Sequence, residues 1–271
     1  MSLFSRKKDY YKIAMIGAGK VASQLAPALE DAGHSINVVF SRHKRNAETL
    51  ASRLYAAEAI NQLDFSRSEA QVFILSVKDD ALSEVAKEIS LPEGALLLHT
   101  AGGRPMDVLA AAICKGIGVL YPLQTFSKEK EVNFKKIPLL IEAADKSTFR
   151  VVRNLAESIG KNVHEVDSES RAMIHVAAIF ACNFSNHMMH IANYLMDKNG
   201  LDFAWLQPLI TDTFQKALAF GPAKTQTGPA ARNDRSTMIK HLEQLQDDEP
   251  ELAQLYRQIS EGIHKFSDEK R

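Results

Sequence analysis

Short apolar runs alternate with amphipathic segments through residues 1–166 of the chain. The apolar runs predict β-strands at 12–16, 36–40, 71–77, 95–99, 117–121, 137–142 and 162–166. The segments between them predict helices at 22–32, 44–57 and 146–159, and a helix up to residue 89 that Asp79 or Asp80 caps. This alternation is typical of an α/β fold, here a Rossmann-type, doubly wound, mainly parallel sheet.

The pattern changes near Asp167, where strand signals give way to helical periodicity. We therefore expect two domains, a dinucleotide-binding domain at 1–166 and an all-α domain at 167–271 for substrate binding and dimerisation. A long helix is predicted from residue 168, capped by Ser168 or Ser170, to about residue 198. Shorter helices are predicted at 203–220, 236–245 and 249–266.

The junction between the first strand and the first helix carries the strongest chemical signal. Its sequence is Gly17-Ala18-Gly19-Lys20-Val21-Ala22, a G-x-G-x-x-A motif. In this context Gly17 allows the tight turn, Gly19 lets a pyrophosphate approach the backbone, and Ala22 lets the helix pack close to the sheet. The N–H groups of the helix N-terminus would then face the anion. A glycine turn without a ligand is the alternative.

The end of the second predicted strand indicates which dinucleotide binds. An NAD site usually has an acidic residue roughly 20 residues after the glycines, to hold the ribose hydroxyls. This chain has Ser41 and Arg42 there, and a guanidinium can grip a 2′-phosphate with two charge-assisted hydrogen bonds. We expect NADP as the cofactor, although the basic run from Arg42 to Arg45 could instead be the solvated start of a helix.

Ligands of open parallel sheets sit outside the carboxyl ends of the strands. This rule places the following residues near the nicotinamide half of the cofactor: Val77, Lys78, Asp79, His99, Thr100, Ala101, Gly102, Gln124 and Thr125. Each has a simpler alternative, since Lys78 could be a solvated strand end and the small residues a tight turn. Thr125 could offer its hydroxyl to a substrate or only stabilise its own turn.

A polar stripe runs along the long predicted helix. Its members fall within one arc of roughly 120° and are Arg171, His175, Cys182, Asn183, Asn186 and His190. The stripe faces either the substrate cleft or a neighbouring helix or subunit. In the first case His175, which titrates near neutrality, donates a proton or orients the substrate. Asn183 would then orient the substrate and Arg171 bind it.

A loop in the second half, Thr227-Gly228-Pro229-Ala230-Ala231-Arg232-Asn233-Asp234, leads into a helix capped by Asn233 or Asp234. Arg232 could bind a substrate carboxylate or phosphate, or form a surface or intersubunit salt bridge. His187 and His190 resemble a metal pair, but no carboxylate or cysteine cluster accompanies them. We therefore expect no metal.

Composition narrows the class of protein. The chain has 33 Lys and Arg against 33 Asp and Glu, so no basic field favours nucleic acid. No apolar run approaches the length of a membrane span, and the N-terminus lacks a signal-peptide core. The two cysteines, Cys114 and Cys182, do not form a disulfide framework, which suits a reducing cytoplasm. A small-molecule substrate is the expected partner.

Five segments together resemble a known bacterial family: GAGKVA, HTAGG, PLQTFS, HVAAIFACNF and TGPAARND. That family joins a Rossmann-like NADP-binding domain to a helical C-terminal domain of unknown function. The chain is more distantly similar to pyrroline-5-carboxylate reductases and deazaflavin-dependent NADP reductases. The resemblance implies an NADP-linked redox reaction and a homodimer formed through the helical domains. Tyr121 and Asn233 depart from the family pattern, which often has His and Gly at these positions.

The sequence therefore predicts an NADP-dependent oxidoreductase that transfers a hydride to or from a small carbonyl or imine. The cofactor supplies the hydride, and the protein positions the reactants and manages a proton. The alternative is an NADP-binding sensor or partner protein without turnover. That protein would keep the glycine turn and Arg42 but would use its helical domain to recognise another macromolecule.

Overall fold

The computed structural model describes residues 9–127 and 130–268. The chain divides into two compact units, Met1–His187 and Met188–Arg271. We call them the sheet unit and the helical unit and describe each by itself. The predicted domain boundary between residues 166 and 167 stays a prediction. In the structure the first helix after the sheet packs within the sheet unit.

The sheet unit is built on one eight-stranded sheet with the strand order β3-β2-β1-β4-β5-β6-β7-β8. The strands are β1 (Lys12–Ile16), β2 (Ser35–Phe40), β3 (Glu58–Ile60), β4 (Val72–Leu75), β5 (Leu96–His99), β6 (Gly116–Pro122), β7 (Leu139–Ala143) and β8 (Val163–Glu165). All neighbouring strands pair in parallel except β6 and β7, which are antiparallel. The predicted mainly parallel, doubly wound sheet is confirmed.

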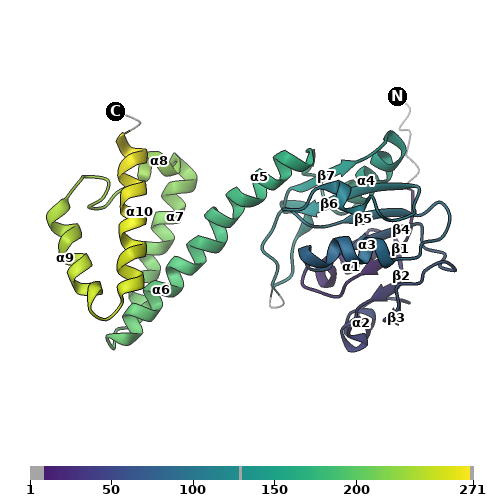
Figure 1. Cartoon of the computed structure of the whole chain (residues 1–271), viewed down its shortest axis with the longest axis horizontal. Helices are drawn as coiled ribbons and strands as arrows, with labels where there is room; N and C mark the ends of the chain where they lie inside the picture. The colour runs from purple at the N-terminus through teal and green to yellow at the C-terminus, as the bar shows by residue number, and fades with distance from the viewer. Residues whose placement is uncertain (1–8, 128–129, 269–271) are drawn as a thin grey trace, which may run out of the picture. The chain divides into compact units, whose positions relative to one another are not determined.

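Helices cover both faces of this sheet (Figure 1). They are α1 (Ala22–Asp31), α2 (Lys44–Ala51), α3 (Leu82–Glu88) and α4 (Lys146–Ile159), and short 3-10 turns lie at Asp79–Ala81, Met106–Leu109 and Phe134–Lys136. One core cluster packs α1, α2 and α4 against the sheet, with Leu25, Leu50 and Leu155 at its centre. A second cluster packs α3 through Leu82 and Val85. Burial on both faces explains the continuous apolar sequence of β4.

Two local predictions for the sheet unit were wrong. The helix expected at 44–57 ends at Ala51, and the short edge strand β3 follows it. Neither Asp79 nor Asp80 caps the next helix, because neither side chain accepts a hydrogen bond from its first turn. By contrast, α4 begins and ends as predicted. The side chain of Asp145 accepts hydrogen bonds from the N–H groups of Ser147 and Thr148 at its start.

The long helix predicted from residue 168 forms in three pieces: α5 (Ser168–Ala178), a π-helical turn (Ile179–Phe184) and α6 (Ser185–Lys198). Its cap is Asp167, whose carboxylate accepts a hydrogen bond from the N–H of Ser170 at 2.7 Å. The predicted caps Ser168 and Ser170 were therefore wrong. The hydroxyl of Ser168 donates instead to the carboxylate of Glu142 on β7, which ties the start of α5 to the sheet.

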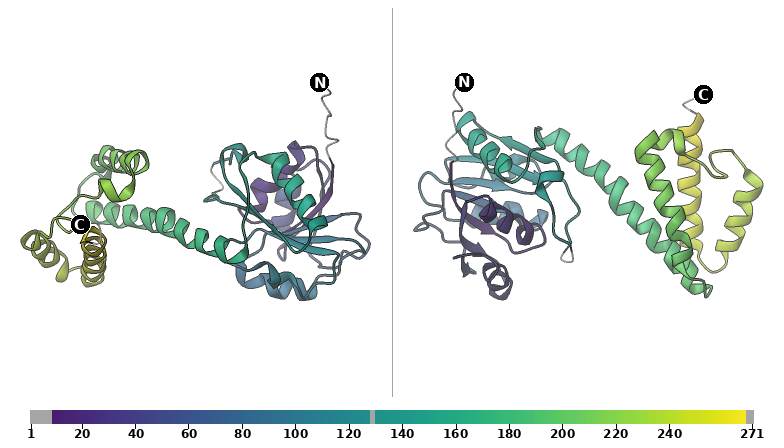
Figure 2. Two further views of the ribbon diagram at one scale, coloured as in Figure 1. Left: turned by 90° about the horizontal axis from the view of Figure 1, so that it is seen from above. Right: turned by 180° about the vertical axis from the view of Figure 1, so that it is seen from behind.

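The helical unit contains most of α6, a 3-10 turn (Phe203–Leu206), α7 (Gln207–Phe220), α8 (Pro222–Thr225), α9 (Arg235–Gln246) and α10 (Pro250–Asp268). Helix α9 packs against α10 (Figures 1 and 2), and side chains of α6 and α10 line one pocket. Asp234 caps α9 by accepting from the N–H of Thr237, as predicted. Asn233 before it has a φ of 54°, a backbone conformation that Asn tolerates. Within the described ranges, no helix is both long and apolar enough for a membrane span.

Candidate functional site

The turn between β1 and α1 has the geometry of a phosphate cradle. Gly17 has a φ of 117°, and a Cβ there would collide with the carbonyl oxygen of Ser76 at the end of β4. Its N–H donates to the carbonyl of Phe40 at 2.8 Å, which holds this turn against the end of β2. A Cβ at Gly19 would meet only the Ser76 oxygen, at 3.9 Å. The space in front of Gly19 is therefore open to a ligand.

The N-terminus of α1 offers unused hydrogen-bond donors to this space. No residue that the structure describes accepts from the N–H groups of Gly19, Lys20 or Val21, and no side chain caps the helix. Ala22 is fully buried against the sheet, as its predicted packing role requires. Free N–H groups at a helix N-terminus bind anions. A pyrophosphate therefore fits the residues present.

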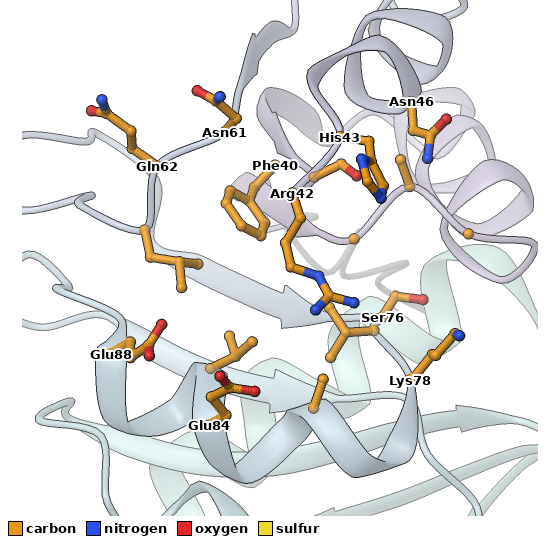
Figure 3. A pocket seen from close by; sticks show the side chains of 18 of the residues that line it. Phe40, Arg42, His43, Asn46, Asn61, Gln62, Ser76, Lys78, Glu84 and Glu88 are labelled. Carbon is orange, nitrogen blue, oxygen red and sulfur yellow. The ribbon is translucent and has the colours of Figure 1, made fainter.

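A pocket of about 840 Å³ lies beside this turn. Its lining includes Ala18, Ser41, Arg42 and Lys78, all predicted to bind the cofactor. Figure 3 shows the guanidinium of Arg42 reaching into the pocket from the end of β2, towards Ser76. Among the described residues, none forms an ion pair with Arg42. Its charge is therefore available to a phosphate group.

The carboxyl ends of β4, β5 and β6 lie side by side in the sheet. The hydroxyl of Thr100, after β5, lies 3.4 Å from the carbonyl of Leu75 and 3.3 Å from the hydroxyl of Ser76, after β4. Val77 also lines the pocket. Ala101 and Gly102, which follow Thr100 in the sequence, are buried. The residues predicted near the nicotinamide that follow β4 and β5 therefore lie together at the carboxyl ends of these strands.

His99, the last residue of β5, is fully buried. Its Nδ1 accepts a hydrogen bond from the N–H of Ala101 at 3.1 Å. Burial and the nearby charge of Arg171 lower the pKa of His99 to about 3. The side chain is therefore neutral at physiological pH and acts as a structural support for the turn that contains Ala101 and Gly102.

A tyrosine and a histidine meet over that turn. The hydroxyl of Tyr121 on β6 lies 3.1 Å from Nδ1 of His175 on α5. Glycine is required beneath them, because a Cβ at Gly102 would lie 2.6 Å from Cζ of Tyr121 and 2.7 Å from Nδ1 of His175. Burial, with the charge of Asp79, raises the pKa of Tyr121. The sequence predicts a role for His175 but gives no sign that Tyr121 contacts it.

Arg171 shows how α5 is held in this position. Its side chain is fully buried, forms an ion pair with Glu142, and donates to the carbonyl of Arg104 at 2.7 Å and to the hydroxyl of Ser168 at 3.2 Å. Through these contacts the guanidinium stabilises the fold and is not available to a substrate. We therefore no longer expect the predicted substrate contact of Arg171. The residue instead places His175, one helical turn later, over the sheet edge.

Three other predicted site residues are exposed. Thr125 is exposed, and its N–H and hydroxyl both lie within hydrogen-bond distance of the side-chain oxygen of Gln124, which favours the turn-stabilising alternative. Asn183 is exposed within the π-helical turn, and Arg232 is exposed in the loop before α9 in the helical unit. Over 9–127 and 130–268, no group of three or more His, Cys, Asp or Glu side chains could hold a metal ion.

Two families match the chain. Residues 5–124 match a family described as "Rossmann-like domain", and residues 137–263 match one described as "Domain of unknown function (DUF2520)". A crystal structure named "putative NADP oxidoreductase" from Bacteroides fragilis is 39% identical. It superposes with a TM-score of 0.86 over 94% of this chain and 98% of that chain.

More distant structures share the fold alone. A reductive aminase from Aspergillus terreus, solved with NADPH and ethyl-5-oxohexanoate, is 16% identical, with a TM-score of 0.69 over 97% of this chain and all of that chain (100%). A 1-pyrroline-5-carboxylate reductase from Streptococcus pyogenes is also 16% identical, with a TM-score of 0.59 over 94% and 99% of the two chains. None of the curated proteins compared with the chain matches it.

Proposed function

Because the chain belongs to the family that joins a Rossmann-like domain to the DUF2520 domain, we propose that it is an NADP-dependent oxidoreductase. The observation that carries this proposal is the open cradle at Gly19 beside a pocket lined by Arg42, which forms no ion pair with any residue that the structure describes. The names of the relatives support it, since they include an NADP oxidoreductase at 39% identity and a reductive aminase solved with NADPH.

The sheet unit supplies the groups that would hold NADP. The N–H groups of Gly19, Lys20 and Val21 would bind the pyrophosphate. Arg42, with the hydroxyl of Ser41, would bind the 2′-phosphate through charge-assisted hydrogen bonds. Two carboxylates, Glu84 and Glu88, line the opposite wall of the pocket. Their negative charges would repel an anionic group from this wall and direct it towards Arg42 on the opposite wall.

The substrate class that we propose is a small carbonyl or imine. When it is bound, the nicotinamide of NADP would accept or donate the hydride. His175 lies over the predicted nicotinamide end of the site, where we propose that it donates a hydrogen bond and a proton to the oxygen or nitrogen of the substrate. Asn183 and Arg232 remain proposed substrate contacts.

We also propose a homodimer formed through the helical unit. Large apolar side chains are exposed on that unit in the single chain, among them Trp205 at 68%, Leu209 at 63% and Leu218 at 88%. Leu209 and Leu218 are nine residues apart and lie on opposite faces of α7 at about 100° per residue. A helix that is apolar on opposite faces is normally buried. Free thiols at Cys114 and Cys182 suit the reducing cytoplasm that we propose as its location.

A substrate screen with a matched variant tests the proposed reaction. Purified protein would be mixed with NADPH and a panel of small ketones, keto acids and cyclic imines, and oxidation of NADPH would be followed by absorbance. We expect turnover with at least one substrate, and a fall in kcat on the order of a hundredfold in His175→Ala, with NADPH affinity unchanged. NADPH binding without turnover on any substrate would favour the alternative, a sensor or partner protein.

A further inference from the structure

The hydrogen bond between Tyr121 and His175 determines which imidazole nitrogen carries a proton. Tyr121 is only 9% exposed. Its hydroxyl has one acceptor within reach in the described chain, Nδ1 of His175. A buried hydroxyl almost always donates its proton to an acceptor. The hydroxyl therefore donates to Nδ1, so Nδ1 carries no proton and Nε2 of the neutral ring does.

We propose that Tyr121 is the positioning residue of the site: it holds His175 as the Nε2–H tautomer and supplies a proton to it. This inference rests on the proposed function for its catalytic consequence, whereas the tautomer itself does not depend on it. The other ring nitrogen, Nε2, has no hydrogen-bond partner in the part of the chain that the structure describes. Nε2–H is therefore the donor available to a substrate.

The proton balance defines what the pair does for a carbonyl substrate. As the carbonyl carbon gains a hydride, the electron pair of the C=O bond moves to oxygen, which takes the proton from Nε2. The hydroxyl of Tyr121 gives its proton to Nδ1 in the same step, so His175 stays neutral in its other tautomer. Solvent then gives a proton to Nε2, and Nδ1 returns its proton to the phenolate, which restores the Nε2–H tautomer. An alkoxide is a stronger base than a phenolate, so the transfer runs downhill.

The surrounding residues hold the side chains of Tyr121 and His175 in contact. The buried ion pair of Arg171 with Glu142 holds α5 against the sheet. The two rings meet edge to face, with centroids 6.0 Å apart. Gly102 is buried beneath them, where any side chain would collide with both. The phenol stays protonated at neutral pH because burial raises the pKa of Tyr121.

A tautomer measurement tests the proposal without any cofactor. The full-length protein would be labelled with ¹⁵N-histidine, and the signals of His175 would be assigned by comparison with His175→Gln. We expect the wild-type ring to show an unprotonated Nδ1 and a protonated Nε2. In Tyr121→Phe, which removes only the hydroxyl, we expect a mixture of the two tautomers. A protonated Nδ1 in the neutral wild-type ring, or an unchanged spectrum in Tyr121→Phe, would overturn the proposal.

The chain contains a matched control for this variant. In the helical unit, the hydroxyl of Tyr256 lies 2.8 Å from Nδ1 of His241, and the two rings also meet edge to face. Tyr256→Phe should alter the signals of His241 in the same way but leave those of His175, and all kinetic constants, unchanged. A loss of turnover in Tyr256→Phe as large as that in Tyr121→Phe would point to a general structural effect instead.

Kinetics then test the proton transfer. With a ketone substrate, Tyr121→Phe should lower kcat on the order of a hundredfold while KM and NADPH affinity stay constant. With a substrate that is already an iminium cation, the nitrogen needs no proton, so the same variant should have little effect. Equal losses on both substrates would contradict the proton transfer. If no substrate turns over, the proposed function fails, and the tautomer measurement still decides the pairing of Tyr121 with His175.

Discussion

The two units differ in how completely they bury their apolar side chains. The sheet unit closes two cores, one on each face of its sheet, with Phe73, Leu97 and many others fully buried. In the described helical unit, only Ala230 and Ala253 are buried apolar residues. The helical unit instead exposes large side chains along α7 and the turn before it, including Trp205 and Leu218.

This difference indicates which unit buries its apolar side chains within a single chain and which unit leaves an apolar surface for a second copy. We expect the sheet unit to build its cofactor pocket without a second copy, because the two cores beside its sheet are buried within the single chain. The helical unit needs a cover for its apolar surface, since exposed patches of this kind mark interaction sites. The proposed dimer supplies that cover.

The largest effect is expected from a charge on the helical unit. Leu218→Glu would place a carboxylate on the surface that we propose a second copy covers. Each copy loses about 2 kcal/mol of apolar burial, so dimer affinity should fall by roughly a thousandfold. Sedimentation would report the mass, and the fluorescence of Trp205, the single tryptophan, would shift to longer wavelength. Tyr55→Glu, at a 97% exposed residue of the sheet unit, is the control and should change neither. A wild-type monomer would refute the proposed dimer.

The buried ion pair of the sheet unit comes next. Glu142→Gln leaves the buried guanidinium of Arg171 without its charge partner, and we expect a loss of about 3 kcal/mol in the free energy of unfolding. Asp212→Asn, which removes the partner of exposed Lys216 in the helical unit, should cost less than about 0.5 kcal/mol. Urea titrations followed by circular dichroism would give both values. Similar losses in the two variants would show that burial does not separate these ion pairs.

A smaller effect is expected on cofactor choice. Ser41→Asp combined with Arg42→Ala removes the guanidinium from the pocket and adds a carboxylate that repels a 2′-phosphate. NADPH affinity should fall at least about tenfold relative to NADH, since charge-assisted hydrogen bonds contribute about 1.5–3 kcal/mol each. Arg45→Ala, at a basic residue that does not line the pocket, is the control. An unchanged NADPH affinity in the double variant would exclude Arg42 as the phosphate ligand.

The last expected effect is gradual: a pH dependence of the stability of the sheet unit. The pKa of His99 is about 3 in the folded chain and about 6.5 in an unfolded one. The unfolded chain therefore binds an extra proton below pH 6.5, and stability falls as pH is lowered towards 3. The slope is about 1.4 kcal/mol per pH unit. Unfolding of His99→Asn, measured from pH 6.5 to 5, should lack this slope. Equal slopes in the variant and wild type would contradict a buried neutral His99.

Features with a local cause could be predicted from the sequence. The strands of the sheet other than β3, and helix α4, follow from apolar periodicity. The turn at Gly17 follows from the position of its glycines between a strand and a helix. Asn233 and Asp234 also occupy the positions that their side chains favour before a helix. In each case, residues adjacent in the sequence determine the structure.

Features that depend on distant partners could not be predicted. Strand β3 has three residues, and its pairing with β2 rather than its own sequence defines it. Arg171 looked like a substrate ligand because its partner Glu142 is 29 residues away. Tyr121 and His175 are separated by 54 residues and meet only because hydrogen bonds hold the start of α5 to β7. Pattern alone identifies the polar stripe on the helix, but only tertiary contacts show that its members have different roles.

Binding of the cofactor to the wild-type chain tests the central claim most directly. The purified protein would be titrated against NADPH and then against NADH, with nicotinamide fluorescence as the readout. We predict micromolar binding of NADPH and at least about tenfold weaker binding of NADH, because Arg42 and the cradle at Gly19 recognise the phosphates. Absence of binding by either dinucleotide would contradict the account. The oxidoreductase proposal would then fail with it.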